Sequence, residues 1–222
     1  MDAAVSAARG ARTVSLRRRA RWLALSVGLA VLVLLETPAA GAAQAKPPAT
    51  DLHALMKWLA HTQDHEGRPF AVLDKRQARL WLFDKKRRPL GSSPVLLGAA
   101  HGDVSVPGIG ERALSDIRPE ERTTPAGRFI MEPGTNAAGE DIFWVDYGAA
   151  VSMHRVRNVH PAERRLQRMA TPTPADNRIS YGCINVPVAF YDQHVRPLFA
   201  AGHGVVYVLP ETRPLQALFS PR

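Results

Sequence analysis

Residues 70–83 read FAVLDKRQARLWLF, in which two short apolar and aromatic runs flank the polar tetrapeptide DKRQ. Runs of this length, rich in Val, Leu, Phe and Trp and separated by a polar turn, are typical of a β-hairpin. A third apolar run at 90–97 follows a charged turn and predicts a further strand. The sequence therefore indicates a β-sheet that begins near Phe70.

The pattern of short strands continues toward the end of the chain. Strands are expected at 128–131, 141–147, 151–156, 184–186 and 204–209, whereas 98–127 is rich in Gly, Pro and charges and is expected to be mostly loop. Pro187 suits the first position of a helix that runs to about Ala200. Because strands do not alternate regularly with long helices, we expect a mainly β fold with a few helices at its margin.

An amphipathic helix precedes the first strand. Leu52, Leu55, Met56 and Leu59 follow helical spacing within 51–65. A Gly-Arg-Pro sequence at 67–69 ends this helix, and 46–50 is a proline-rich linker. Residues 157–179 form an arginine-rich insert, with one or two helical turns expected at 162–169.

The N-terminal segment has the pattern of an export signal. Four arginines between 17 and 21 precede an uncharged apolar run from Trp22 to Leu35, and Ala43-Gln44-Ala45 is a typical cleavage site. The apolar run is too short for a comfortable membrane span. Residues 1–45 are therefore predicted to be a signal peptide or, if uncleaved, an N-terminal anchor. The Arg18-Arg19 pair also suggests twin-arginine export. Either route places the remainder in the periplasm or cell envelope.

Composition and charge restrict the class of protein. The 222 residues are 45% hydrophobic and 22% charged, which excludes wholesale disorder. The net charge is +9, but residues 46–222 retain only +5, without the basic stripe expected of a nucleic-acid-binding protein. The single cysteine, Cys183, excludes an intrachain disulfide and a cysteine-rich zinc site. A zinc site made from Cys183 and two histidines lacks the short histidine spacing of a dedicated site, so we expect no metal.

The segment at 180–187, SYGCINVP, carries the candidate chemistry. A nucleophilic thiol needs exposure, a favoured thiolate and a nearby base. Gly182 allows close approach of a substrate, and His154 lies in an apolar strand context 29 residues upstream. A cysteine paired with a histidine distant in sequence is the usual layout of an acyl-transfer site. The alternatives are that Cys183 is a small buried apolar residue and that His154 is structural.

These residues resemble a known family. The order Ser180-Tyr181-Gly182-Cys183-Ile184-Asn185 is similar to the Ser/Thr-His-Gly-Cys motif of the L,D-transpeptidase (YkuD-type) catalytic domain. Met153-His154 resembles that family's upstream histidine motif, and 124–129, TPAGRF, resembles its T-P-x-G-x-F segment. The resemblance covers 68–210 and implies that family's catalytic fold there, a β-sandwich or barrel-like sheet with a few helices at its margin. Residues 46–67 are then the linker and helix, and 211–222 are a C-terminal tail.

The resemblance implies an exported cysteine acyltransferase acting on peptidoglycan stem peptides, with links to cell-wall biogenesis and cell shape. Cys183 would attack the stem and release a terminal D-amino acid, and His154 would act as general base and then acid. The Arg155 carbonyl would orient the imidazole. Backbone N–H groups around Tyr181–Cys183 would form the oxyanion hole, and Ser180 and Asn185 would shape the loop. No cofactor is implied.

Two positions depart from the family pattern. Tyr181 replaces a histidine, and its hydroxyl either donates to an oxyanion or belongs to a ring that packs against the sheet. Arg155 replaces a glycine. Together with Arg157 and Arg178, Arg155 is a candidate for binding stem carboxylates, with a solvated surface charge as the alternative. The 157–179 insert lengthens the interval between His154 and Cys183 and is interpreted as a substrate lid, an acceptor-binding element or an inert loop.

The sequence leaves three questions open: whether water or an amine accepts the acyl group, where the amine comes from, and whether the protein is catalytic. Water instead of an amine would make the protein an L,D-carboxypeptidase. The acceptor amine would come from another stem or from a protein lysine. The departures at 155 and 181 also allow a non-catalytic wall-binding module. We expect contact with a membrane only through an uncleaved N-terminal segment.

Overall fold

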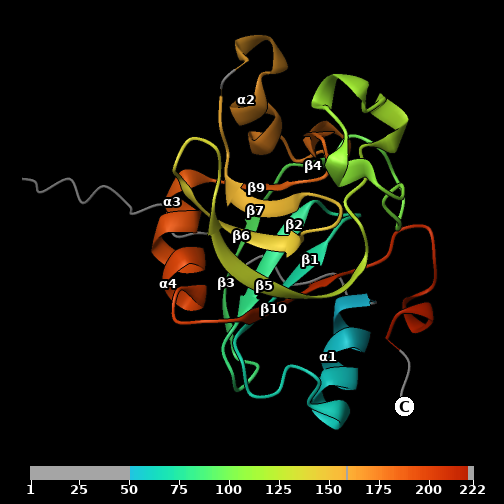
Figure 1. The fold of residues 1–222 in the computed structure, drawn as a ribbon. Helices are drawn as coiled ribbons and strands as arrows, with labels where there is room; N and C mark the ends of the chain where they lie inside the picture. Colours follow the sequence, from blue (N-terminus) through green and yellow to red (C-terminus); the bar gives the residue numbers. More distant parts are fainter. Residues whose placement is uncertain (1–50, 159, 220–222) are drawn as a thin grey trace, which may run out of the picture. The chain divides into compact units, whose positions relative to one another are not determined.

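The computed structural model describes residues 51–158 and 160–219 (Figure 1). The predicted leader at 1–45 and linker at 46–50 lie outside the described residues. The described chain folds around one eight-stranded sheet with the order β3-β2-β1-β10-β5-β6-β7-β9. Its strands are β1 Phe70–Asp74, β2 Arg79–Phe83, β3 Pro89–Pro94, β5 Gly127–Thr135, β6 Asp141–Asp146, β7 Val151–Arg155, β9 Ile184–Val186 and β10 Gly204–Val208.

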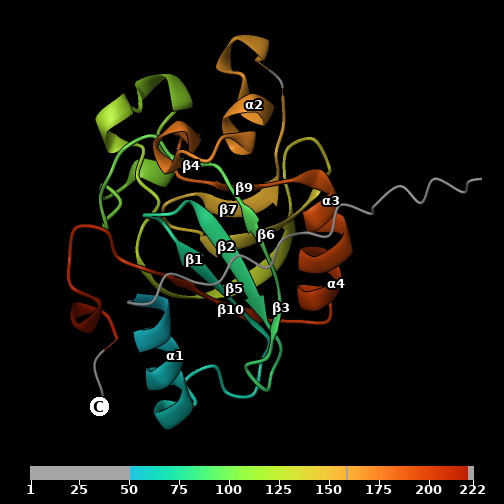
Figure 2. The same ribbon diagram turned by 180° about the vertical axis from the view of Figure 1, so that it is seen from behind.

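Neighbouring strands are antiparallel except for two parallel pairs, β1 with β10 and β7 with β9. The sheet nearly closes into a barrel, because Leu96 bridges to Asn185 and so joins the segment after β3 to β9 at the opposite edge. A second, two-stranded pair of β4 (Leu97–Gly98) and β8 (Arg178–Ser180) lies beside this junction (Figures 1 and 2). The expectation of a mainly β, barrel-like fold is confirmed.

The single strand predicted at 90–97 is divided in the structure into β3 and β4. Pairing of β3 with β2 ends at Pro94, which faces Arg79. Proline has no N–H to donate to a ladder, so the strand terminates there. The short strand β8 was not predicted, because it lies in the insert, where proline and arginine obscure any alternation.

The central strands are buried on both faces, which explains their nearly continuous apolar sequence. In β1, Ala71 and Leu73 face an inner core, and Phe70 and Val72 face an outer one. Strand β10 alternates in the same way. The inner core fills the barrel-like sheet, whereas the outer core is covered by α1 (Asp51–Thr62) and by the C-terminal residues around the short helix η7 (Leu215–Ala217).

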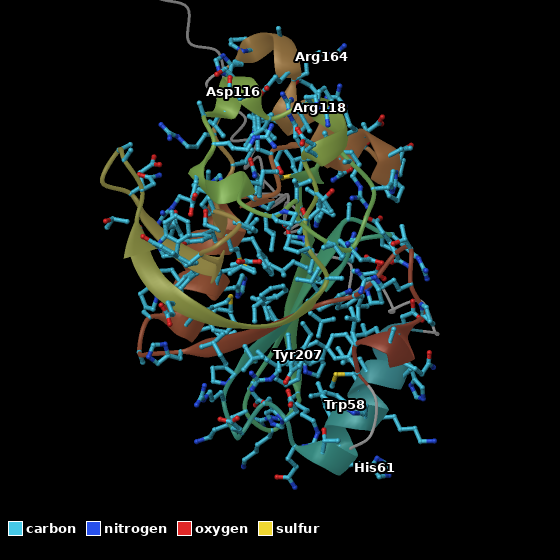
Figure 3. The ribbon with its side chains drawn as sticks, turned by 45° about the vertical axis from the view of Figure 1, so that its right-hand side comes forward. Trp58, His61, Asp116, Arg118, Arg164 and Tyr207 are labelled. Atoms are coloured by element: carbon cyan, nitrogen blue, oxygen red, sulfur yellow. The ribbon has the colours of Figure 1, made fainter. Side chains whose placement is uncertain are left out.

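Helix α1 packs onto the outer core through the predicted apolar positions. Leu52, Leu55 and Leu59 are buried against the sheet. Figure 3 shows Trp58 of α1 beside Tyr207 of β10, and their rings meet edge to face at 6.3 Å between centroids. The helix ends at Thr62, shorter than the predicted 51–65, because Gln63 takes a positive φ of 50°.

The helix predicted at 187–200 is one helical segment in three parts. It comprises α3 (Val188–Phe190), a π-helical turn η6 (Tyr191–Val195) and α4 (Arg196–Phe199). Pro187 stands one residue before it. Pro197 cannot donate the backbone bond that an α-helix requires, which accounts for the widened turn just ahead of it. The segment buries Tyr191, Val195 and Phe199 in the inner core.

Two irregular regions lie at one end of the sheet, near β4 and β9 (Figures 1 and 2). The first is the predicted loop region, with short helices η1 (Ile109–Glu111), η2 (Leu114–Asp116) and η3 (Pro119–Glu121). The second is the insert, with η4 (Pro161–Glu163), α2 (Arg165–Ala170) and η5 (Pro174–Asn177), close to the helical turns expected there. Figure 3 labels Asp116, Arg118 and Arg164 in these regions.

Glu121 holds the first region together. Its carboxylate accepts hydrogen bonds from the side chain of Arg112 at 2.9 and 3.1 Å and from the backbone N–H of Arg118. These bonds lower the pKa of Glu121 to about 2. Within residues 51–158 and 160–219, the helices are all too short or too polar to span a bilayer.

Candidate active site

The parallel pairing of β7 with β9 brings the two predicted catalytic residues together. Met153 pairs with Ile184, and His154 pairs with Asn185. Cys183 directly precedes Ile184, so its side chain meets that of His154 at the start of the strand. Their hydrogen bond and mutual charge interaction affect the pKa of both groups.

The imidazole is held in one tautomer. Nδ1 of His154 lies 2.7 Å from the carbonyl oxygen of Arg155, the contact that the resemblance implied. A carbonyl can only accept, so Nδ1 carries the proton. The other ring nitrogen, Nε2, is then available to accept a proton from the thiol.

The surroundings of Cys183 favour the thiolate. The side chain is half-buried, with Sγ 3.7 Å from both the Ser152 hydroxyl and the Ala150 carbonyl. Burial opposes ionisation of the thiol, but His154 and the N–H and hydroxyl of Ser152 outweigh burial and lower the pKa of Cys183 overall.

The environment of His154 favours the imidazolium. Burial by itself would lower its pKa, but the hydrogen bond with Cys183, the charge of the thiolate and the Arg155 carbonyl raise the pKa of His154 overall. The two shifts have opposite signs and both favour a thiolate–imidazolium pair. Such a pair combines an activated nucleophile with an acid that can protonate a leaving group.

The loop that carries Cys183 is fixed by the two polar residues predicted to shape it. The Ser180 hydroxyl donates to the Cys183 carbonyl at 2.7 Å and accepts from the Gly182 N–H at 3.1 Å. The Asn185 amide donates to the same Cys183 carbonyl at 3.2 Å. Both side chains are almost fully buried. The backbone around the nucleophile is thus held at several points.

Gly182 is required at its position by both conformation and space. Its φ is +132°, a conformation that residues with a side chain rarely adopt. A Cβ would lie 2.9 Å from the Thr123 carbonyl oxygen and 3.2 Å from Cγ2 of Val151. Only glycine therefore lets the chain pass between these two segments and turn into Cys183.

Tyr181 and Arg155 have side-chain partners outside the reacting pair. The guanidinium of Arg122 lies over the Tyr181 ring, 3.9 Å from its centroid. The Arg155 side chain pairs with Asp141 at 2.9 Å and with Asp192 at 2.6 Å. Arg155 therefore contributes its carbonyl to the site, as implied, while its side chain joins β7 to β6 and to the π-helical turn.

The prediction that Arg178 binds a substrate carboxylate does not agree with the structure. Its side chain is 7% exposed and forms an ion pair with the buried Glu211. It also donates to the backbone carbonyl of Lys75 at 2.9 Å. Arg178 therefore neutralises an internal carboxylate. Arg157, by contrast, is 42% exposed and lies 3.5 Å from Glu140 at the surface.

Sequence reasoning missed Arg165, which ties the insert to the site. From α2 its Nη1 donates to Asn185 Oδ1 at 2.7 Å, and its Nε lies 2.5 Å from Glu163 Oε2. Asn185 in turn holds the Cys183 carbonyl. The positive charge of Arg165 also opposes protonation of His154. No local motif marks this arginine, because its partner lies 20 residues away in the sequence.

Among the described residues, no group of three or more His, Cys, Asp or Glu side chains is arranged to hold a metal ion. Comparison with protein-family models gives no match, and comparison with curated proteins gives none either.

Several solved structures are similar to this chain. The helical cell shape determining protein Pgp2 from Campylobacter jejuni shares 14% identity and has a TM-score of 0.41, with 71% of this chain and 56% of Pgp2 covered. The catalytic domain of the E. faecium L,D-transpeptidase shares 17% identity and has a TM-score of 0.36, with 65% and 99% covered.

A fused Zn-dependent amidase/peptidase/peptidoglycan-binding domain-containing protein from Clostridium acetobutylicum shares 15% identity, with a TM-score of 0.39 and 74% and 64% covered. The chain thus spans little more than half the length of the Pgp2 chain. All three TM-scores lie below 0.5.

Proposed function

We propose that the protein is a cysteine acyltransferase that acts on peptidoglycan stem peptides. The observation that carries the proposal is the Cys183–His154 pair, in which the pKa of the thiol is lowered and that of the imidazole is raised. The Arg155 carbonyl holds the imidazole with Nε2 available for the thiol proton. The choice of substrate rests on the sequence resemblance of 68–210 to the L,D-transpeptidase catalytic domain.

The first half-reaction transfers the stem to the enzyme. The Cys183 thiolate attacks the carbonyl carbon of the third stem residue, forming a C–S bond and an oxyanion. Backbone N–H groups of the Tyr181–Cys183 loop stabilise this oxyanion, and one such donor is worth about 3–4 kcal/mol. As the intermediate collapses, the C–N bond breaks and His154 gives its proton to the departing D-amino acid.

The second half-reaction releases the acyl group. An amine from another stem or from a protein lysine, or water, loses a proton to His154 and attacks the thioester. The new C–N or C–O bond forms as the C–S bond breaks, and the Cys183 thiolate leaves beside the protonated His154, which regenerates the thiolate–imidazolium pair. Because the thioester conserves the energy of the original amide, cross-linking by this route needs no ATP.

This independence from ATP suits the proposed location in the periplasm or cell envelope, with residues 1–45 as the export signal. We assign the catalytic domain to 68–210, preceded by a linker and helix at 46–67 and followed by a tail at 211–222. The exposed Arg157 stays a candidate for contact with stem carboxylates.

The test is to incubate the full chain with a defined tetrapeptide stem and to weigh the products by mass spectrometry. An adduct on Cys183 together with release of one D-amino acid supports the acyltransferase. Dimeric stems identify an amine acceptor, and a tripeptide alone identifies water and an L,D-carboxypeptidase. Stem binding without any adduct would contradict the proposal and favour a non-catalytic wall-binding module.

Three variants make the test specific. Cys183→Ala and His154→Ala should abolish turnover while the circular dichroism spectrum stays unchanged. His203→Ala is the matched control, because His203 is exposed in the loop before β10, away from β7 and β9. Full turnover by Cys183→Ala would refute the mechanism.

A further inference from the structure

Lys75, the residue that follows β1, has a fully buried ammonium group. The Lys75 side chain has no exposed surface, and its Nζ donates to Asp103 Oδ1 at 2.8 Å and to the Thr124 carbonyl at 2.9 Å. It also donates to the Gly102 carbonyl. A buried charge is costly unless it is fully paired, and here each of the three ammonium protons has an acceptor.

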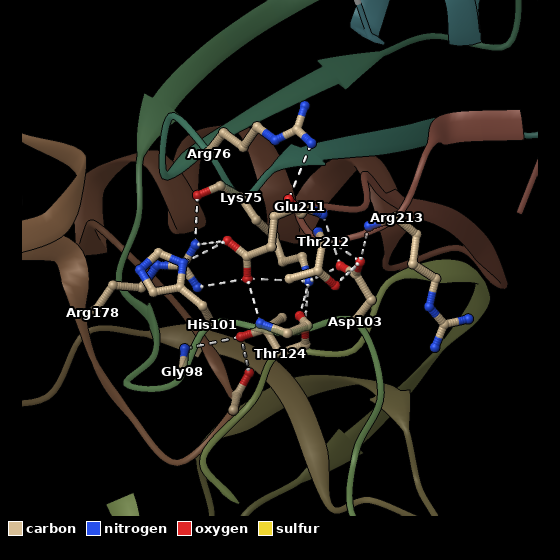
Figure 4. A network of polar contacts seen from close by, with 12 residues as sticks. Lys75, Arg76, Gly98, His101, Asp103, Thr124, Arg178, Glu211, Thr212 and Arg213 are labelled. Carbon is tan, nitrogen blue, oxygen red and sulfur yellow. Dashed lines mark hydrogen bonds and ion pairs between the residues drawn. The ribbon is translucent and has the colours of Figure 1, made fainter. Parts of the chain in front are cut away.

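The carboxylates around Lys75 are bound on their other sides as well (Figure 4). Asp103 Oδ2 accepts hydrogen bonds from the backbone N–H and the hydroxyl of Thr212 at 2.9 and 2.6 Å. Glu211 lies 3.5 Å from Lys75 Nζ and pairs with Arg178. We call Lys75, Asp103, Arg178 and Glu211 the buried ion cluster. Each member of the buried ion cluster is held either by two other members or by one member and a backbone group.

Thr124 connects the buried ion cluster to the Tyr181–Cys183 loop. The residue is fully buried, and its carbonyl accepts from Lys75. Its hydroxyl accepts from the Gly98 N–H at 2.9 Å and donates to the Gly182 carbonyl at 2.8 Å (Figure 4 shows the first contact). The chain of contacts therefore runs from Lys75 through Thr124 to the peptide that joins Gly182 to Cys183.

The orientation of that peptide determines where one oxyanion donor points. A trans peptide is planar, with its carbonyl and N–H in opposite directions. Since the Gly182 carbonyl is directed at Thr124, the Cys183 N–H points the other way. On the next peptide, the Cys183 carbonyl is held by Ser180 and Asn185. Glycine has no side chain to restrict its ψ, so the bond from the Thr124 hydroxyl is the contact that fixes the rotation of the Gly182–Cys183 peptide.

We propose that Lys75 and Thr124 are positioning residues, which fix the Gly182–Cys183 peptide so that the Cys183 N–H serves as a preorganised oxyanion donor. The inference rests on the proposed function of Cys183 as an acyl-transfer nucleophile. It is separate from activation of the thiol, because His154 and Ser152 approach Cys183 from β7, whereas Thr124 bonds to the Gly182 carbonyl.

The test compares two reactions of the same sulfur in the full chain. Alkylation of Cys183 by iodoacetamide needs the thiolate but forms no oxyanion, whereas acylation by 4-nitrophenyl acetate needs both. Thr124→Val removes the hydroxyl at nearly constant volume, and Thr124→Ser restores it. Thr123→Val is the matched control, because Thr123 is the neighbouring residue and its hydroxyl does not bond to the Gly182 carbonyl. Cys183→Ala supplies the background rate.

We expect Thr124→Val to lose about 10²-fold in acylation, the loss typical for one oxyanion donor. Its alkylation rate and the pH midpoint of alkylation should stay within about twofold and about 0.3 pH units of the parent values. Thr124→Ser should recover at least about tenfold of the loss. Acylation by Thr124→Val within about threefold of the parent would overturn the proposal, and so would an equal fall in both reactions.

A second variant covers the case in which Thr124→Val does not fold, as judged by circular dichroism. Lys75→Met combined with Asp103→Asn removes both buried charges of one ion pair and so leaves no ammonium unpaired. It should lower acylation at least about tenfold relative to alkylation; an unchanged ratio would overturn the proposal. Because 4-nitrophenyl acetate is not a stem peptide, an inactive parent in the tetrapeptide assay would refute the proposed substrate without deciding this result.

Discussion

Replacement of Gly182 by alanine tests whether the turn into Cys183 is as tight as the structure shows. The φ of +132° costs about 1–3 kcal/mol for a residue with a side chain. The new Cβ would also lie 2.9 Å from the backbone oxygen of Thr123, which cannot rotate away, and 3.2 Å from Val151. Overpacking of this kind adds about 1–3 kcal/mol. We therefore expect Gly182→Ala to lower the free energy of unfolding by about 4 kcal/mol in total.

Gly202→Ala is the matched control. Gly202 has a similar φ of +145°, but a Cβ at this position would have nothing within 4 Å of it, so alanine carries the conformational cost without the contact. Both variants are measured by urea unfolding followed through tryptophan fluorescence, and Cys183 is measured by iodoacetamide alkylation. Gly182→Ala should be less stable than Gly202→Ala by at least about 1 kcal/mol, and it alone should slow alkylation. Equal destabilisation of the two variants would refute the close packing of Gly182.

Three more outcomes follow from the contacts described above. His154→Ala should raise the pH midpoint of Cys183 alkylation toward that of an ordinary thiol and lower acyl transfer by about 10²–10⁴-fold; an unmoved midpoint would contradict the ion pair. Arg178→Met removes one cationic partner of the buried Glu211, which keeps Lys75 Nζ at 3.5 Å and the Gly102 N–H at 3.0 Å, and should cost about 2–3 kcal/mol in urea unfolding, whereas the exposed Arg157→Ala should cost less than about 1 kcal/mol. The folded-state pKa of Glu121 is lowered to about 2, so its stabilising contribution is complete above its unfolded-state pKa and is lost as the pH falls toward 2. Glu121→Gln should therefore flatten the acid limb of a stability-against-pH curve, and an unchanged limb would refute this assignment.

Much of the fold was predictable because its signals are local. The alternation in 70–83 marks two strands whose successive residues face different cores, and the apolar positions of 51–62 mark a helix that covers one of these cores. The break at Pro94 and the widened turn before Pro197 depend on single prolines inside longer apolar patterns. The sequence contains both prolines, but their effect depends on which neighbouring strand or helical turn needs the missing N–H.

The site residues likewise include some that local sequence predicts and others whose role depends on distant partners. Cys183 and His154 were predictable because Cys183 is the single cysteine of the sequence and lies in a recognisable motif. The hydrogen bonds from Ser180 and Asn185 that hold its carbonyl span three residues or fewer. Arg165 bonds to Asn185 across 20 residues of sequence, Thr124 bonds to Gly182 across 58, and Arg178 is directed inward by Glu211. Such pairings depend on how strands meet, so a charge next to a motif in the sequence does not show which way its side chain points.

Strand β10 lies in the middle of the sheet, between β1 and β5, although it is the last strand of the described chain. Its partner β1 is more than 130 residues earlier, so the centre of the sheet can be completed only after residues 204–208 have been synthesised. In a chain that stops before Gly204, β1 and β5 both lack their shared partner β10. The remaining strands then form the sets β3-β2-β1 and β5-β6-β7-β9, each with an unpaired edge where β10 would lie. The complete sheet can therefore form only once residues 204–208 are present.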